Sequence, residues 1–299
     1  MSKLDFVVNS VQTEKKKKRI AVAAAHDEVV LRAVVEAYNK GIVVPLLVGD
    51  REKIQEISEN IGLSVENCEV IHCQEKECAV RAVELVSQGH ADLLMKGAVK
   101  TGDLMSVVLQ KEYGLRIGNT LTMVSVFDIP SYERLLIASD GAMIIAPTLE
   151  QKVDIINACV HVARRLGIQQ PKVAVLGALE IANPKMPVTL EAAILSKMNQ
   201  RNQIKNCVVD GPLALDNAVS VEAARHKGIE SPVAGKADIL IMPDIEAGNI
   251  FYKAMVFLGG AKVASTIVGA RVPVVLTSRA DSDETKFYSI ALGAFLAEG

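Results

Sequence analysis

A short polar segment near the C-terminal end of the chain combines residue types that suit chemistry on a phosphate-containing substrate. An apolar run over residues 272–276 leads into it. Arg279 offers a planar fork of donors that matches phosphate oxygens, and the hydroxyl of Ser278 can donate to a developing oxyanion. Asp281 and Asp283 follow and can accept a proton. These residues indicate acyl transfer to or from phosphate, and a surface turn of paired charges is the alternative.

A second polar segment, "LMKGAVKTGDL" at residues 94–104, follows another apolar run. Glycines allow the backbone to approach a ligand closely, and lysines supply positive charge, so this composition suits a loop around phosphate. The P-loop spacing G-x-x-x-x-G-K-[ST] is absent from it. An ordinary glycine turn is the alternative. The candidate substrate-binding residues here are Lys96, Gly97, Lys100, Thr101 and Gly102.

Two further polar segments follow predicted strands later in the chain. In residues 209–220, Gly211 is expected to end a strand, with Asp216 and Asn217 beyond a proline turn, although turn formation or helix capping also explains these residues. In residues 242–253 the candidates for substrate binding are Glu246, Asn249 and Lys253, of which the first two follow a strand together with Gly248. Tyr252 and Lys253 are expected to open a helix. Capping explains Asn249 but not the whole cluster.

The apolar pattern alternates between strand and helix along the chain. Residues 27–41 and 148–167 repeat apolar positions at helical spacing, and Thr148 with Gln151 forms a predicted capping box. This alternation predicts an α/β fold with a parallel sheet, whose ligands bind beyond the carboxyl ends of the strands. The predicted buried strands are 19–25, 43–49, 91–97, 171–177, 205–211, 237–243 and 272–278.

Composition excludes several classes of protein. Half of the 299 residues are hydrophobic, which is enough for a large core, and a net charge of −2 argues against binding to nucleic acid. No apolar stretch approaches the roughly 18 residues of a membrane span, and the N-terminus lacks signal-peptide features, so a cytoplasmic location is expected. The five cysteines form no C-x-x-C pair, and no histidine pair suggests a metal site.

The polar segments, taken in order, resemble the phosphate acetyl/butyryl transferase family. The wording "DGPLALDNAVS", "EAGNIFYK" and "TSRADS" is most similar to the butyryl branch, and the similarity runs over almost the whole chain. The resemblance implies a reversible reaction in which acyl-CoA and phosphate give acyl phosphate and CoA. It implies no cofactor, because CoA is a substrate, and it implies a preference for acyl groups of about four or five carbons.

The same resemblance implies two α/β domains like those of isocitrate and isopropylmalate dehydrogenases, with a cleft between them. The first domain would comprise residues 1–117 and 267–299, and the second residues 118–266. A homodimer is the assembly that the family implies.

The family's Ser-Arg pair falls on Ser278 and Arg279, which would hold the acyl phosphate and stabilise its transition state. The acetyl branch has a catalytic aspartate seven residues after this serine, where the present chain has Thr285. Asp281 or Asp283 would then act as the base, with a slight preference for Asp281.

The acetyl branch also has an arginine that contacts CoA, and no arginine lies near Ser106 here. Lys96, Lys100 or Arg116 is expected to replace it.

Three alternatives stay open at this point. A phosphate acetyltransferase would share the motifs. A metal- and NAD-dependent hydroxy-acid dehydrogenase of the same fold would need converging carboxylates and an arginine-rich segment, and only the carboxylates are supplied. A protein that binds CoA or acyl phosphate without turnover is the third alternative. The carboxylates available to the dehydrogenase are Asp210, Asp216, Asp238, Asp244 and Glu246.

Overall fold

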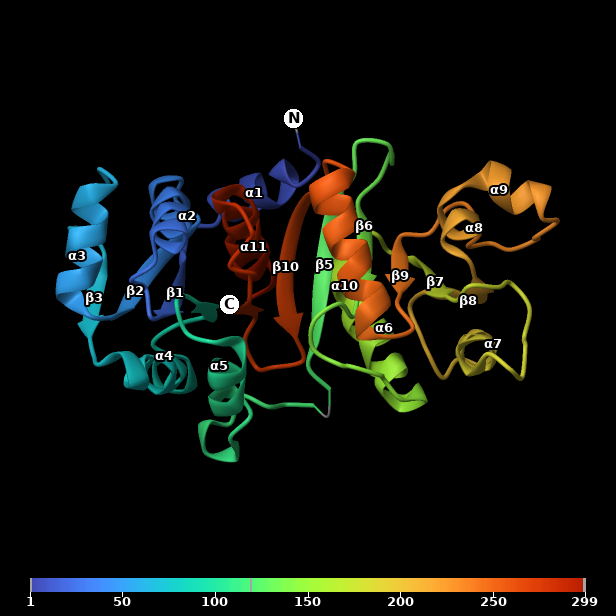
Figure 1. Cartoon of the computed structure of the whole chain (residues 1–299), viewed down its shortest axis with the longest axis horizontal. Coiled ribbons are helices and arrows are strands. Elements are labelled where there is room, and N and C mark those ends of the chain that lie inside the picture. The colour runs from blue at the N-terminus through green and yellow to red at the C-terminus, as the bar shows by residue number, and fades with distance from the viewer. Residues whose placement is uncertain (1, 119, 298–299) are drawn as a thin grey trace. The chain divides into compact units, whose positions relative to one another are not determined.

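The computed structural model describes residues 2–118 and 120–297, and it divides into two compact units (Figure 1). Unit 1 comprises Met1–Leu121 and Val263–Gly299, so it is built from both ends of the chain, and unit 2 comprises Thr122–Lys262. The boundaries expected near residues 117 and 267 concern folding domains and stay a prediction.

The strands of unit 1 form a mostly parallel arrangement. Their order is β3 (Glu69–His72), β2 (Val43–Gly49), β1 (Lys18–Ala23), β4 (Leu93–Lys96), β11 (Val274–Val275) and β10 (Lys262–Val268). Neighbouring pairs from β3 to β11 are parallel, and β11 pairs with β10 in the antiparallel direction. Burial is nearly continuous along β1, β2 and β4, which explains their unbroken apolar runs.

The helices of unit 1 are α1 (Asp5–Gln12), α2 (Glu28–Asn39), α3 (Arg51–Asn60), α4 (Cys78–Ser87), α5 (Thr101–Val108) and α11 (Asp283–Leu296), with the short 3₁₀ helices η1 (Glu75–Glu77) and η2 (Lys111–Tyr113). Asp27 caps α2 by accepting a hydrogen bond from the backbone N–H of Val30, which confirms the helix expected there. The C-terminal helix α11 packs against both α2 and α1 (Figure 1).

Unit 2 has the strand order β5 (Thr122–Asp128), β6 (Leu136–Ser139), β9 (Ile239–Ile241), β7 (Lys172–Leu176) and β8 (Val208–Leu213). Only β5 and β6 are antiparallel to each other. The helices are α6 (Leu149–Arg165), α7 (Pro187–Gln200), α8 (Leu215–Val219), α9 (Val221–His226) and α10 (Ile245–Lys253), followed by the π-helical turn η3 (Ala254–Leu258). The predicted capping box of Thr148 and Gln151 is present at the start of α6.

The structure corrects several details of the sequence-based prediction. Strands β3, β5, β6 and β10 were not predicted, and the strand expected over residues 272–278 is only Val274–Val275. Strand β8 continues through Pro212 to Leu213, so no turn begins at Gly211. Because β8 lies at the end of the strand order of unit 2, the missing N–H of Pro212 costs little there.

The helix expected to open at Tyr252 begins earlier, at Ile245. Asp244 caps it by accepting a hydrogen bond from Ala247 N, so Asn249 lies inside the helix rather than at its start. Among residues 2–118 and 120–297, no helix combines the length and the apolar character that a membrane span requires.

Candidate active site

The two polar segments of unit 1 meet at one pocket of about 470 Å³. Val275 of β11 pairs in parallel with Met95 of β4, so the chain leaves both strands at the same edge of the sheet. No carboxylate is among the lining residues, and the cationic side chains suit an anionic ligand. The lining residues are Lys96, Val99, Lys100, Thr101, Thr277, Ser278 and Arg279.

Lys96 is the most deeply buried cation of this pocket. Its side chain is 5% exposed, and Nζ donates to the carbonyl oxygens of Gly97 at 3.0 Å and Val99 at 3.3 Å. Burial lowers the pKa of Lys96, and the positive charges of Arg279 and Lys286 lower it further. An anion in the pocket would relieve this unfavourable electrostatic environment.

The glycines of the first segment differ in what they contribute. A Cβ on Gly97 would lie 2.2 Å from the carbonyl oxygen of Ala24, so this position packs against the backbone after β1. A Cβ on Gly102 would meet no atom within 4 Å, so packing does not require glycine there. Helix α5 begins at Thr101 with Lys100 as its N-cap residue, and no side chain caps it. The N–H groups of its first turn add to the positive potential.

Asp281 organises the turn that carries Ser278 and Arg279. Asp281 is 7% exposed, and its carboxylate accepts a hydrogen bond from Ser278 N at 2.7 Å, while Asp281 N donates to Ser278 O at 3.2 Å. The side chains of Ser278 and Arg279 are both exposed. The buried carboxylate of Asp281 therefore stabilises the turn, and the side chains of Ser278 and Arg279 remain accessible to solvent.

Lys286 is a site residue that the sequence analysis missed. This α11 side chain is buried, and Nζ donates to Asp281 O at 2.7 Å and Ser278 O at 3.1 Å. Burial lowers its pKa, and the nearby charges of Asp281 and Asp27 oppose that shift. No local sequence signal marks Lys286, because its role depends on α11 folding back beneath the turn.

The other polar residues of this region cap α11. Ser282 accepts a hydrogen bond from Thr285 N at 3.1 Å, and its hydroxyl lies 3.2 Å from Oγ1 of Thr285. Thr285, which stands where the acetyl branch has aspartate, therefore supports the helix start. Asp283 is exposed at the first position of α11 and accepts a hydrogen bond from Glu284 N at 3.0 Å.

Thr277 also lines the pocket and was not singled out as a site residue from the sequence. Its side chain is 3% exposed, and Oγ1 has no hydrogen-bond partner among the described residues. A buried hydroxyl left unpaired costs roughly 1–3 kcal/mol. Such a cost in a pocket wall is typical of a site whose ligand supplies the missing partner.

Arg116 is not among the residues that line this pocket. It is exposed in the loop after η2, where Nε donates to Gly118 O at 3.1 Å. Ser106, the position near which the family's arginine was sought, is exposed on α5 and donates to Asp103 O.

The predicted pair Asp216 and Asn217 lies in unit 2, within a group of compensating charges. Lys227 forms ion pairs with Glu180 and with Asp216, the latter at 3.4 Å. Asn217 is fully buried, and its amide group donates to Glu180, while its side-chain oxygen has no partner among the described residues. This group ties the start of α8 to the segment after β7.

The remaining predicted residues of unit 2 lie on α10. Asn249 donates from Nδ2 to Gly141 O at 3.1 Å and so links α10 to the segment after β6. Glu246 and Lys253 are exposed near the two ends of the helix.

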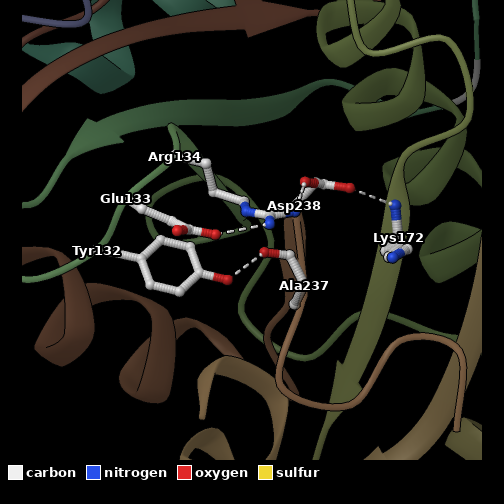
Figure 2. Close-up of polar contacts among 6 residues, drawn as sticks. All are labelled: Tyr132, Glu133, Arg134, Lys172, Ala237 and Asp238. Atoms are coloured by element: carbon white, nitrogen blue, oxygen red, sulfur yellow. Dashed lines mark hydrogen bonds and ion pairs between the residues drawn. The ribbon is translucent and has the colours of Figure 1, made fainter. Parts of the chain in front are cut away.

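The carboxylates that a metal-dependent dehydrogenase would need have separate partners. Asp238 is buried and binds Arg134 at 3.2 Å and the backbone N–H of Lys172 at 2.8 Å, and Tyr132 donates to the neighbouring carbonyl of Ala237 (Figure 2). Asp244 caps α10. Within residues 2–118 and 120–297, no three histidine, cysteine or acidic residues are grouped as metal ligands would be.

The amino-acid sequence has extensive similarity to known proteins. The family model for phosphate acetyl/butaryl transferase matches residues 4–81 and 75–294. The phosphate acetyltransferase of Thermotoga maritima is 61% identical, over 94% of this chain and 96% of the relative. The phosphate butyryltransferase of Clostridium acetobutylicum is 52% identical, over 95% of this chain and 94% of the relative.

Solved structures are similar over the same extent. A branched-chain phosphotransacylase from Enterococcus faecalis V583 has a TM-score of 0.84 at 34% identity, covering 94% of this chain and 99% of its own. A 4-hydroxythreonine-4-phosphate dehydrogenase from Klebsiella pneumoniae has a TM-score of 0.56 at 14% identity, covering 95% of this chain and 100% of its own, and this likeness concerns the fold alone. The predicted α/β fold class is confirmed.

Proposed function

The chain belongs to the phosphate acetyl/butyryl transferase family and is an acyltransferase, and we propose that it moves a short acyl group reversibly between CoA and inorganic phosphate. The observation that carries this proposal is the pocket of unit 1, which Lys96 and Arg279 line and which has no carboxylate among its lining residues. This pocket binds free phosphate in one direction of the reaction and the phosphate group of the acyl phosphate in the other.

Arg279 and Lys96 bind this phosphate in different ways. The guanidinium of Arg279 is exposed and can form paired hydrogen bonds with two phosphate oxygens. The ammonium of Lys96 is a point charge held in place by two backbone carbonyls, so little side-chain entropy is lost when an anion arrives. Together they neutralise the charge that grows on phosphate as it leaves the acyl group.

The chemical step needs a thiolate, a carbonyl and a leaving group. The CoA thiol loses its proton to a carboxylate, and the sulfur attacks the acyl carbonyl. The resulting tetrahedral oxyanion accepts hydrogen bonds from Ser278, and the bond to the phosphate oxygen then breaks, releasing phosphate and acyl-CoA. Because a free thiol has a pKa near 8.5, a positioned base contributes about 10²- to 10⁴-fold to the rate.

Of the two candidate acids, we assign the base role to Asp283. Its carboxylate is exposed, whereas the carboxylate of Asp281 is buried and accepts the Ser278 backbone N–H. Asp281 is then a positioning residue for the turn. This assignment departs from the slight preference for Asp281 that the sequence alone supports.

CoA carries phosphates of its own, so its contacts require further cations. Arg116 is exposed and serves as a proposed CoA contact, together with Lys100 of the pocket. Lys253 of unit 2 is exposed and stays a predicted substrate-binding residue. Four residues of unit 2 stay predictions for substrate binding: Glu246, Asn249, Asp216 and Asn217. The last three have the protein partners described above.

For the acyl group we propose a preference for four or five carbons over acetyl. The support is the butyryl-type wording "TSRADS" and the 52% identity to a phosphate butyryltransferase, and the 61% identity to the acetyltransferase of Thermotoga maritima makes the acetyl group the alternative. Burial of each additional methylene in an apolar pocket contributes roughly 1–3 kcal/mol, so the preference should exceed about tenfold in kcat/KM. Equal kcat/KM values for acetyl-CoA and butyryl-CoA would contradict it.

The proposed reaction needs no metal or redox cofactor, since the permanent charge of Arg279 stabilises the phosphate. Activity should therefore survive incubation with EDTA, and loss of activity that Mg²⁺ restores would contradict this point. The five cysteines are all free thiols, which suits a reducing cytoplasm, and the protein is proposed to act there.

A homodimer is proposed as the assembly. Ile250, Phe257 and Leu258 of α10 and η3 expose 62–88% of their surface, which is unusual for large apolar side chains so close in sequence. A monomer mass by light scattering at micromolar concentration would contradict this proposal.

The function is tested by mixing the purified chain with butyryl-CoA and following thiol release on addition of phosphate. Release should require phosphate and should reverse when butyryl phosphate and CoA are supplied instead. Sulfate in place of phosphate provides the control for ionic strength. The absence of phosphate-dependent release with acetyl-, butyryl- and branched acyl-CoA would overturn the proposed activity and favour a binding protein.

A further inference from the structure

Thr277 occupies a position where the structure leaves a hydroxyl without a partner beside a cationic pocket. The residue lies two positions after the end of β11 and one position before Ser278, and it lines the same pocket as Lys96 at the end of β4. Its side chain is 3% exposed, and its hydroxyl oxygen has no hydrogen-bond partner among the described residues.

The other buried hydroxyls in the described part of unit 1 do not share this feature. Thr266 of β10 donates to Val274 O at 3.3 Å, and Ser289 of α11 donates to Thr285 O at 2.8 Å. Thr285 is paired with Ser282. Unpaired hydroxyls are therefore not a general feature of this core, and the one at Thr277 belongs to a residue that lines the pocket.

The neighbours of Thr277 define the chemistry of the missing partner. The pocket wall holds the ammonium of Lys96, the guanidinium of Arg279 and the hydroxyl of Ser278, all of which donate hydrogen bonds. A threonine hydroxyl can add one more donor to this set. A ligand that accepts several hydrogen bonds from different directions and carries negative charge, such as a tetrahedral phosphate, matches all four groups.

We propose that Thr277 is a substrate-binding residue whose hydroxyl donates to an oxygen of the phosphate held by Lys96 and Arg279. This inference rests on the proposed function for the identity of the anion. It has a consequence that an ordinary structural threonine would not have. Replacing the hydroxyl with a methyl group should weaken phosphate binding without destabilising the protein free of ligand, because no protein partner is lost.

The test compares Thr277→Val with Thr277→Ser, and Thr266→Val is the matched control for removing a buried hydroxyl that does have a partner. Thermal unfolding without ligand and the KM for phosphate are measured for each, together with the stabilisation by inorganic phosphate alone. We expect Thr277→Val to raise the KM about tenfold with an unchanged or higher Tm. Thr277→Ser should stay within about threefold of wild type, and Thr266→Val should lower Tm with an unchanged KM for phosphate.

An unchanged KM and unchanged phosphate stabilisation in Thr277→Val would overturn the inference. A fall in its Tm as large as that of Thr266→Val would also overturn it, since the hydroxyl would then have a structural partner. Direct stabilisation by phosphate separates this inference from the proposed activity. If the wild-type chain binds phosphate but transfers no acyl group, and Thr277→Val weakens that binding, the activity fails while the site assignment stands.

Discussion

Buried lysines have different hydrogen-bond partners in the two units of this protein. In unit 2, Lys152 is 3% exposed and forms an ion pair with Glu191, and the buried carboxylate of Asp238 is likewise paired with Arg134 (Figure 2). In unit 1, Lys96 and Lys286 are equally buried, but the hydrogen bonds of their ammonium groups go to backbone carbonyls.

The difference is consistent with the proposed division between charges that stabilise the fold and charges that bind substrate. A buried charge that serves only the fold is usually compensated by an opposite charge, because desolvation is expensive. Lys96 and Lys286 donate to carbonyl dipoles rather than to a carboxylate, and the nearby charges of Asp27 and Asp281 only partly offset the lowering of their pKa values by burial. Arg279 adds a third cation near Lys96. Unit 1 therefore keeps a positive potential at its pocket, which an anionic substrate can neutralise.

The largest effect is expected at the two candidate bases, Asp281 and Asp283, both of which act on the charge of Lys286. It tests whether one of them is a counter-charge rather than a catalyst. Asp283→Asn should lower kcat by about 10²- to 10⁴-fold and remove the acid limb of the pH-rate profile. Asp281→Asn should keep that limb and most of the activity, because an amide oxygen can still accept the Ser278 N–H. The reverse pattern would make Asp281 the base.

Replacing one buried lysine in each unit tests whether the unpaired lysine binds substrate and the paired lysine does not. Lys96→Met should lower kcat/KM for phosphate about 30- to 100-fold, since a charge-assisted hydrogen bond to the substrate contributes roughly 2–3 kcal/mol. Lys152→Met should leave kcat/KM within about twofold, because its charge is already cancelled by Glu191. Similar losses of activity in the two variants would show that the contrast between the units has no functional meaning.

A smaller effect is expected when charge is kept but geometry is changed. Arg279→Lys should lower kcat/KM at least about tenfold, or roughly 1.4 kcal/mol, because a point charge replaces a two-pronged donor. Arg271→Lys is the matched control. The guanidinium of Arg271 donates to the backbone carbonyl of Ser87 at 2.6 Å, and Arg271 is not among the residues that line the pocket. Full activity of Arg279→Lys would indicate that only charge matters at this position.

The smallest effect concerns alkaline pH. Burial lowers the pKa values of Lys96 and Lys286 below 10.5, so the folded protein binds these protons less tightly than the unfolded chain does. Their contribution to the free energy of unfolding should therefore rise between the lowered pKa and 10.5, by at most about 1.4 kcal/mol per pH unit for each proton.

The measurement is the unfolding free energy of wild type and Lys96→Met as a function of pH, in which the variant should show a smaller alkaline rise. The kcat/KM for phosphate should fall over the same range, because neutral Lys96 attracts the anion less strongly. Parallel stability curves for the two proteins would contradict a lowered pKa of Lys96.

Much of this architecture could be predicted, and the failures have local causes. The capping box at Thr148 and the helix after Asp27 followed from their own residues and were confirmed. Strands β5, β6 and β10 were missed because their apolar runs lie outside the simple alternation of strand and helix, in antiparallel pairs. Asn249 was misplaced because the stronger cap, Asp244, starts α10 earlier.

The amino-acid sequence by itself determined the alternation of elements, and with it the α/β fold class and the position of polar residues after buried strands. These properties depend on the spacing of apolar residues along a short stretch of chain. The ordered motifs also determined the resemblance to a transferase family, which the similarity of the whole chain confirmed.

Only the tertiary structure decided which polar residues meet. The pairing of β11 with β4 brings Arg279 and Thr277 to the same pocket as Lys96, across some 180 residues of chain. The return of α11 places Lys286 under the turn, and Asp281 is turned inward to hold Ser278. Whether a charge is cancelled or left to act on a substrate depends on such distant neighbours, and local sequence does not specify them.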